Sequence, residues 1–272
     1  LSNFSINVHL PRQSEFDSGT AKLAVQDTGP GMDLDEVRNA VRAGFSGNDP
    51  LGKLGLFGMG FNIASARLGR RTKVMTTKRG DPSWLVIDID LDEMQRTGQF
   101  SAPVSYEPKE DDEIHGTIVE VSRLKGDFKS GLSRGPGRMK IRKKLQRIYS
   151  NILNDHPVIL KVAEYDVIPW SHCCWDESRT VTLGSGIEHS PRVEIDYTLP
   201  ENMFCKTCWH WLEPASVRDD TCHMCGTEGD MELRERRIHG WLGIQRFFDQ
   251  DHYGIDFIRN GRVIESLNRD CF

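Results

Sequence analysis

The chain has 272 residues, of which 38% are hydrophobic and 28% are charged, and its formal net charge is -5. This composition excludes wholesale disorder, the length favours two domains, and the acidic balance argues against a dedicated nucleic-acid-binding protein. Its apolar runs fall short of the roughly 18 residues of a membrane helix and no secretion signal opens the chain, so we expect no membrane partner and a cytoplasmic location, or a nuclear one in a eukaryote.

The first part of the chain predicts an α+β pattern. Residues 6–10 and 22–25 have strand character and are expected to form an antiparallel pair. A short helix should follow Asp33, a good N-cap residue, and a second helix of small residues should span 62–68. Alternating β-branched and apolar residues predict further strands at 72–77, 84–89 and 117–121.

A stretch rich in Gly, Pro and Ser leads into a basic helix expected at 138–153, and we place the domain boundary directly after it. The predicted domains are therefore 1–155 and 156–272. The second should contain a hairpin at 255–264, because Asn-Gly is the strongest short turn signal. Its other strands are expected at 158–162, 193–197 and 240–245.

The first chemical motif is Asp27-Thr28-Gly29-Pro30-Gly31, at the end of the second predicted strand. A carboxylate at the base of a pocket can accept a hydrogen bond from an exocyclic amino group such as that of adenine, and glycines let the backbone approach a flat ring. Met32 could then lie against that ring. By itself the run is also an ordinary turn sequence.

The second motif, Gly55-x-x-Gly58-x-Gly60, opens the helix expected at 62–68. Exposed backbone N–H groups and the helix dipole favour phosphate binding there without any side chain. A dinucleotide-binding fingerprint is the alternative, with Asp81 or Asp88 as its acidic residue, but the predicted helix is too short for a good crossover.

Together with Gly116-Thr117 at the head of a later strand, these motifs resemble in their order the GHKL ATPase superfamily of gyrase B subunits, MutL, MORC proteins, heat-shock chaperones and histidine kinases. The resemblance covers about the first 155 residues. It implies a Bergerat-type sandwich, a mixed sheet covered by helices, with ATP and Mg²⁺ as ligands and an ATP lid at 33–54. The implied ATP-binding residues are Asp27, Gly29, Gly31, Met32, Lys53, Gly55, Phe57, Gly58, Met59, Gly60, Phe61 and Thr117.

Residues 254–264 resemble the transducer domain that follows the nucleotide domain in several branches of this superfamily but not in histidine kinases. The presence of a Phe, Phe61, directly after the second glycine motif is similar to the pattern of the MORC-like and chaperone-like branches. The alternative interpretation of residues 254–264 is a hairpin whose charged tip runs from Arg259 to Arg262.

The catalytic residues implied by the resemblance are not assigned within the chain. The family carries a water-activating Glu and a magnesium-binding Asn on a helix before the first strand, so both are expected upstream of Leu1. Glu15 and Asp17 lie in an expected polar loop, a poor support for a general base. The lysine that reaches the γ-phosphate from the transducer domain is likewise not identified.

Four of the seven cysteines form two Cys-x-x-Cys pairs separated by thirteen residues, which predicts a zinc-ribbon insertion at 203–228. Four thiolates leave no open position on the metal, so a structural Zn²⁺ is expected. His210 and His223 are alternative ligands, and a redox pair or iron–sulfur ligation is less favoured. The predicted ligands are Cys205, Cys208, Cys222 and Cys225; Cys173, Cys174 and Cys271 are interpreted as ordinary thiols.

Two further features have competing interpretations. Trp209 and Trp211 flank the first cysteine pair and could form a binding platform, although packing of the small ribbon is favoured. The basic helix could neutralise nucleic-acid phosphates or be a solvated face. Its cations are Arg138, Lys140, Arg142, Lys143, Lys144 and Arg147.

The sequence thus predicts an ATPase module in which lid closure over ATP and Mg²⁺ drives dimerisation and action on a macromolecular client, with DNA and protein both compatible. The alternative is a non-catalytic, nucleotide-responsive interaction module whose zinc ribbon and basic helix bind nucleic acid or protein. A Rossmann-type oxidoreductase, which would bind NAD, ranks far behind.

Overall fold

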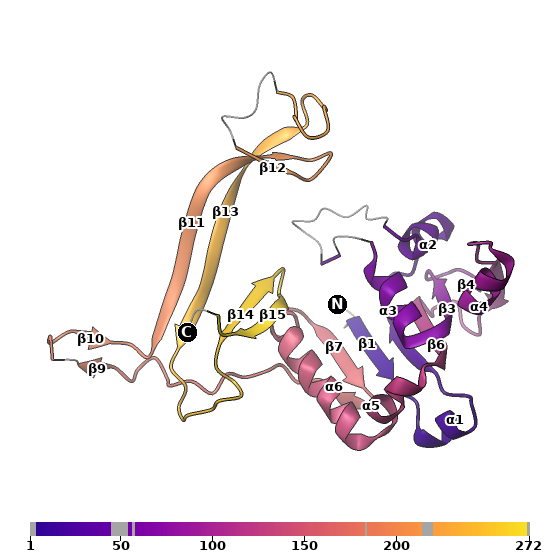
Figure 1. Cartoon of the computed structure of the whole chain (residues 1–272), viewed down its shortest axis with the longest axis horizontal. Coiled ribbons are helices and arrows are strands. Elements are labelled where there is room, and N and C mark those ends of the chain that lie inside the picture. The colour runs from indigo at the N-terminus through magenta and orange to yellow at the C-terminus, as the bar shows by residue number, and fades with distance from the viewer. Residues whose placement is uncertain (1–3, 45–53, 56–57, 183, 214–219, 271–272) are drawn as a thin grey trace. The chain divides into compact units, whose positions relative to one another are not determined.

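The computed structural model describes residues 4–44, 54–55, 58–182, 184–213 and 220–270 (Figure 1). The chain divides into two compact units, and each is described by itself. Unit 1 comprises Leu1–Trp170 and Asp256–Ser266, and unit 2 comprises Ser171–Ile255 and Leu267–Phe272. Unit 1 thus extends past Asp155, where the sequence placed the domain boundary, and includes most of the late hairpin.

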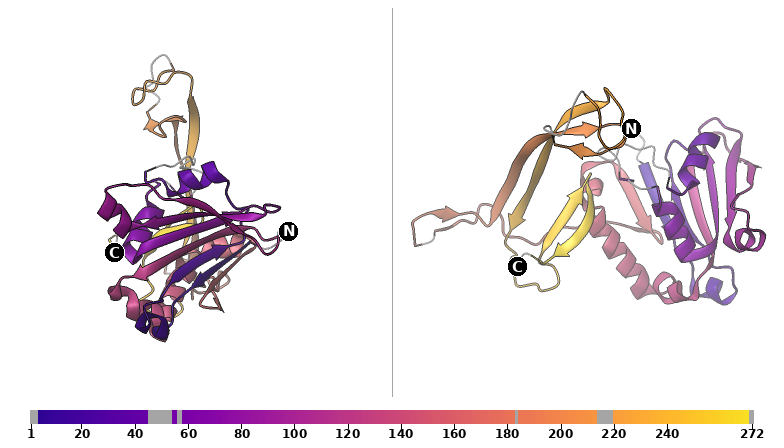
Figure 2. Two further views of the ribbon diagram at one scale, coloured as in Figure 1. Left: turned by 90° about the vertical axis from the view of Figure 1, so that its right-hand side faces the viewer. Right: turned by 45° about the horizontal axis from the view of Figure 1, so that its top comes forward.

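Unit 1 is built on an eight-stranded mixed sheet with the order β5-β4-β3-β6-β2-β1-β7-β8 (Figure 2). Its neighbouring strands are antiparallel except for β1 and β7, which are parallel. The predicted antiparallel pairing of β1 with β2 is confirmed. The strands are β1 (Phe4–His9), β2 (Leu23–Asp27), β3 (Gly69–Thr77), β4 (Ser83–Asp90), β5 (Val104–Pro108), β6 (Gly116–Leu124), β7 (Val158–Val162) and β8 (Tyr165–Asp166).

The helices of unit 1 pack against this sheet, which confirms the α+β class. Val37 of α2 is fully buried against Val74, Leu85 and Ile87 of the sheet, and a second cluster joins Leu160 and its neighbours to α6. The helices are α1 (Gln13–Asp17), α2 (Leu34–Val41), α3 (Gly60–Leu68), α4 (Leu91–Thr97), η1 (Gly126–Phe128), α5 (Lys129–Ser133), α6 (Gly135–Ile148) and α7 (Ser150–Asp155).

Asp33 caps α2 as the sequence predicts. Its side chain accepts a hydrogen bond from the backbone N–H of Glu36 at 2.9 Å, and the Glu36 carboxylate accepts one from the Asp33 N–H at 2.8 Å. This reciprocal capping box satisfies two backbone donors at the start of the helix. It fixes the chain directly after the first glycine motif.

The predicted hairpin is confirmed as β14 (Ile255–Arg259) and β15 (Arg262–Asn268). Its turn residues have positive φ, 49° at Asn260 and 75° at Gly261, as an Asn-Gly turn requires. Asp256 forms an ion pair at 2.8 Å with Arg147 of α6, and both side chains are only 13% exposed. A Cβ on Gly261 would lie 2.9 Å from Ile152 Cγ1, so the hairpin tip packs tightly on α7.

Unit 2 is dominated by a long two-stranded ribbon of β11 (Arg192–Cys205) and β13 (Met231–Gly243), visible in Figure 1. A β-bulge interrupts its register between Leu199 and Asn202. The short strand β12 (Trp211–Leu212) pairs with Met203 and Phe204 at the C-terminal end of β11, and we call this end the distal end of the ribbon. A separate pair is formed by β9 (Val181–Thr182) and β10 (Glu188–His189). Within the described ranges of both units, no helix has the length and apolar character to cross a membrane.

Candidate nucleotide site and metal centre

Asp27 ends β2 in the middle of the sheet, where it pairs in register with Ile6 of β1 and Thr117 of β6. The Asp27 Oδ1 atom accepts a 2.7 Å hydrogen bond from the backbone N–H of Gly29. Among the described residues, no hydrogen bond reaches the second carboxylate oxygen, Oδ2. The half-buried carboxylate therefore has one oxygen turned to its own loop and a second oxygen with no hydrogen-bond donor among the described residues.

The glycines of the first and third motifs permit backbone contacts that no other residue allows. Gly31 has φ +76°, and a Cβ there would overlap the carbonyl oxygen of Thr77. Gly116 has φ +127°, and a Cβ there would overlap the carbonyl oxygen of Asp27. Because these positions are glycine, the backbone at the ends of β2 and β3 and at the start of β6 comes into close contact at one end of the strands.

Thr76 connects these strand ends, although no sequence motif includes it. Its hydroxyl accepts a 2.9 Å hydrogen bond from the Met32 N–H and lies 3.2 Å from the Gly116 carbonyl, to which it can donate. The Thr117 hydroxyl lies 3.1 Å from the Thr76 hydroxyl and can donate a hydrogen bond to it. Thr76 is fully buried, so this network is fixed by the fold.

The second glycine motif leads into α3, and residues 55 and 58–61 are described. Gly58 has φ +59°, and its carbonyl accepts a 3.2 Å hydrogen bond from the Gly44 N–H. Met59 is the N-cap of α3, and within the described part of the chain no side chain caps that end of the helix. Uncapped N–H groups at the start of a nine-residue helix are suited to an anion.

The remaining predicted ATP-binding residues divide into two groups. Met32 and Phe61 are partly buried and pack against the same core cluster, which brings the first and second motifs onto one side of the sheet. Both residues therefore also contribute to core packing. Lys53 and Phe57 lie outside the described residues.

The lid predicted at 33–54 begins with a fixed segment. Lys78 Nζ lies 3.0 Å from Asp33 and 2.8 Å from Glu36, which ties the start of α2 to the end of β3. The pKa of the Asp33 carboxyl is lowered, mainly by the hydrogen bond from the Glu36 backbone N–H and secondly by the contact with Lys78. Val37 is fully buried, so α2 is part of the core. Residues 45–53 of the predicted lid lie outside the described residues.

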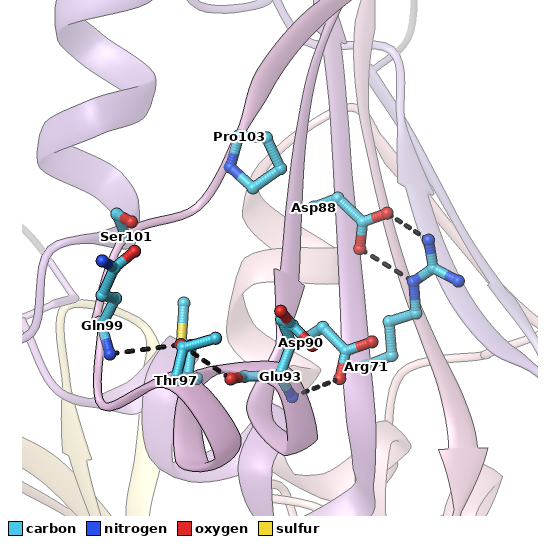
Figure 3. Close-up of a pocket in the computed structure, with 9 residues that line it drawn as sticks. Arg71, Asp88, Asp90, Glu93, Thr97, Gln99, Ser101 and Pro103 are labelled. Carbon is cyan, nitrogen blue, oxygen red and sulfur yellow. Dashed lines mark hydrogen bonds and ion pairs between the residues drawn. The ribbon is translucent and has the colours of Figure 1, made fainter.

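An open cavity of about 360 Å³ lies at the other end of β3 and β4, beside α4 (Figure 3). Arg71 forms a bidentate ion pair with Asp88 there, which lowers the pKa of that carboxyl. Asp90 and Glu93 also line the cavity and pair with Arg123 and Arg96, which do not line it. A triphosphate would meet three carboxylates and one cation, Arg71, that is already paired, so we do not assign nucleotide binding to this cavity.

The four predicted zinc ligands come together at the distal end of the ribbon, and their sulfur atoms lie within 4.8 Å of one another. The Cys205–Cys225 and Cys208–Cys222 sulfur pairs are separated by 3.7 and 3.6 Å. A tetrahedron with Zn–S bonds of about 2.3 Å has an edge of about 3.8 Å, whereas a disulfide bond measures about 2.05 Å. The spacing is therefore compatible with zinc and excludes disulfide pairing in this arrangement.

The thiols of this cluster differ in acidity. Desolvation raises the pKa of Cys208 to about 12, with further contributions from the neighbouring cysteine sulfurs. The Thr227 hydroxyl, 3.3 Å from Cys225, lowers the pKa of that thiol to about 6. His210 and His223 are not part of the sulfur cluster.

Aromatic side chains contact one another beside Cys205, although Trp209 remains exposed. Phe204 is fully buried, with ring centroids 6.0 Å from Trp209 and 5.0 Å from Trp211. The Arg234 guanidinium lies over the Phe204 ring at 4.3 Å. These contacts give the distal end of the ribbon a small core next to the cysteines.

Half of the cations predicted to lie on the basic helix have structural partners. Arg138 donates to the Leu132 and Pro11 carbonyls at 3.0 and 2.7 Å, and Arg147 pairs with Asp256. Arg142 lies over the Tyr165 ring. The three lysines, in contrast, are exposed: Lys140, Lys143 and Lys144.

Residues 2–117 match a family model described as "Histidine kinase-, DNA gyrase B-, and HSP90-like ATPase". No curated protein matches the chain. The matched range contains all three glycine motifs and ends at Thr117. This match supports the GHKL superfamily for residues 2–117 and agrees with the mixed, helix-covered sheet of unit 1.

Proposed function

We propose that the chain is a GHKL-type ATP-binding module that hydrolyses ATP with Mg²⁺ and uses lid closure and dimerisation to act on a macromolecular client, for which DNA is one candidate. The observation that carries this proposal is the meeting of motifs from residues 27–31 and 116–117 at one sheet edge. Asp27 and Thr117 are register partners, and the Thr76 hydroxyl bridges Thr117 to the Met32 N–H. The family match supports ATP binding in general.

Each part of the proposed site has a distinct task. Asp27 accepts the adenine amino group at Oδ2, while Gly29 and Gly31 let the backbone approach the ring and Met32 borders it. The N-terminus of α3 takes the phosphates through its backbone N–H groups. The other contributors are Lys53, Gly55, Phe57, Gly58, Met59, Gly60, Phe61 and Thr117.

Mg²⁺ would neutralise phosphate charge during hydrolysis. We assign neither its ligand nor a catalytic base within this chain, since the resemblance places both before the first strand. The branch assignment, MORC-like or chaperone-like with a transducer domain, rests on the resemblance of residues 254–264 and Phe61, and the hairpin of β14 and β15 is compatible with it. The ion pair of Asp256 with Arg147 fixes this hairpin, most of which belongs to unit 1, against α6.

We further propose that Cys205, Cys208, Cys222 and Cys225 hold one structural Zn²⁺. The support is the sulfur spacing, which fits a tetrahedral site, and the small aromatic core beside it. With all four positions taken by sulfur, the ion would stabilise the distal end of the ribbon and would not activate water.

The alternative function is a non-catalytic interaction module in which nucleotide is only a conformational ligand. The observation that favours it is the exposure of Lys140, Lys143 and Lys144 on α6, because exposed lysines can neutralise nucleic-acid phosphates. ATP turnover and dimerisation of the full-length protein, with and without DNA, separate the two functions. Turnover that stays at the background level favours the alternative.

Asp27→Asn tests the adenine assignment directly. The amide would present a donor or a neutral acceptor to the adenine amino group, so ATP affinity should fall about tenfold or more. Isothermal titration of both proteins with Mg-ATP provides the measurement, and Asp155→Asn, at the exposed end of α7, is a matched control. Equal affinities of the wild type and Asp27→Asn would show that the adenine assignment is wrong.

A further inference from the structure

His115, directly before Gly116 at the start of β6, links three segments of unit 1 although it belongs to no sequence motif. Its half-buried ring has Nδ1 at 2.7 Å from the carbonyl oxygen of Gly29. Its other nitrogen, Nε2, lies 2.9 Å from a guanidinium nitrogen of Arg79. The ring thus joins the first glycine motif to the turn between β3 and β4.

The partners of the ring determine which nitrogen carries the proton. An arginine side chain can only donate, so Nε2 of His115 must accept from Arg79. The proton then lies on Nδ1, which donates to the Gly29 carbonyl. Glu113 pairs with the other end of the Arg79 guanidinium at 3.3 Å and helps to orient it.

These hydrogen bonds hold Gly29 on both sides. Its carbonyl accepts from His115, and its N–H donates to Asp27 Oδ1 at 2.7 Å. Gly29 is buried, and a Cβ there would lie 2.7 Å from Asp27 Oδ1. The orientation of this backbone therefore determines which carboxylate oxygen of Asp27 is turned inward and which remains for a ligand.

We propose that His115 is a positioning residue for adenine recognition. It acts through the backbone of Gly29 on the Asp27 carboxylate and does not itself touch the nucleotide. The inference rests on the proposed function, because it concerns how the same site distinguishes a purine with a 6-amino group from one without it. Loss of the ring would let Gly29 rotate and would loosen the carboxylate that reads this group.

The test compares binding of ATP with binding of purine riboside 5′-triphosphate, which lacks the 6-amino group, by isothermal titration of the full chain. The wild type should prefer ATP by about tenfold, the value of one hydrogen bond to a carboxylate. His115→Ala should lose most of this preference. His115→Asn, which keeps a donor near the position of Nδ1, should retain it, and His9→Ala, at the exposed end of β1, is the matched control.

The outcomes separate the inference from the proposed function. If the wild type shows no preference for ATP, the adenine assignment itself fails. If Asp27→Asn removes the preference and a folded His115→Ala retains it, His115 has no positioning role. Should His115→Ala not fold, His115→Asn is compared with His115→Gln, whose longer side chain places its amide too far from the backbone to donate to the Gly29 carbonyl. Equal preferences in those two variants would overturn the inference.

Discussion

At the scale of single residues, the glycines of this site fall into two physical classes. Gly31 and Gly116 have positive φ, and a side chain at either position would overlap a backbone carbonyl of a neighbouring strand end. For Gly60, at the start of α3, no atom of the described residues outside the helix backbone lies within 4 Å of the position of a Cβ. The fold of the described residues requires glycine at the first two positions, whereas it does not require glycine at the third.

Gly31→Ala and Gly60→Ala should therefore behave differently. The first forces strained backbone against Thr77 and should lower the free energy of unfolding by about 2 kcal/mol or more. The second should leave stability unchanged or slightly higher, because alanine favours helix, but should weaken ATP binding if phosphates approach the start of α3. Urea unfolding and ATP titration of both variants measure this. A Gly60→Ala variant with wild-type ATP affinity would contradict phosphate binding there.

Sequence motifs identified Asp27 and the glycines because their chemistry is visible in consecutive residues. Thr76, Lys78 and His115 could not be found in this way. Their partners are separated from them by 44, 45 and 86 positions in the chain, so their roles follow from strand register. The nearest signal was the position of His115 directly before the Gly-Thr pair.

At the scale of secondary structure, most strands of the central sheet can be predicted because they are half-buried and alternate in polarity. The sequence does not predict α1, α4, β5 or β8, since their residues are mostly polar and largely exposed. The basic helix was predicted to be continuous over 138–153 but ends at Ile148, and α7 begins at Ser150. The Ser150 hydroxyl donates to the Trp170 carbonyl at 2.9 Å, a tertiary contact that periodicity does not reveal.

The ribbon of unit 2 was predicted only in part. β13 begins at Met231, nine residues before the strand expected at 240–245, because charged residues occupy both of its faces. Asp196 pairs with Arg237 across the ribbon, and Arg237 lowers the pKa of that carboxyl. A two-stranded ribbon leaves both faces in water, so it lacks the polarity alternation of a half-buried strand.

Metal analysis tests the zinc proposal at the distal end of this ribbon. Protein purified with a thiol reductant should contain about one equivalent of zinc per chain, and replacement of Cys205 and Cys222 with Ser should remove it. Cys173→Ser, which changes an exposed cysteine outside the cluster, should retain the metal. Wild-type protein without zinc, or a double variant that keeps it, would contradict the assignment. ATP affinity should persist in the double variant, because its proposed determinants lie in unit 1.

At the scale of the whole molecule, unit 1 contains the complete first and third motifs, the start of α3 and most of the late hairpin, which the Arg147–Asp256 ion pair fixes against α6. The sequence placed the domain boundary near Asp155, where the basic helix ends. β7, expected to open the second domain, instead pairs parallel to β1 in the central sheet. Local sequence cannot reveal this pairing, because the two strands lie at opposite ends of unit 1's main segment in the chain.

Hydrogen exchange of the full chain with and without Mg-ATP tests the central claim most directly, because it locates the nucleotide on the sheet. The proposed site predicts slower exchange at residues 27–32, 58–61 and 116–117, with no change at residues 88–99 beside the acidic cavity of Figure 3. Protection confined to residues 88–99, or no protection at saturating ATP, would contradict the account.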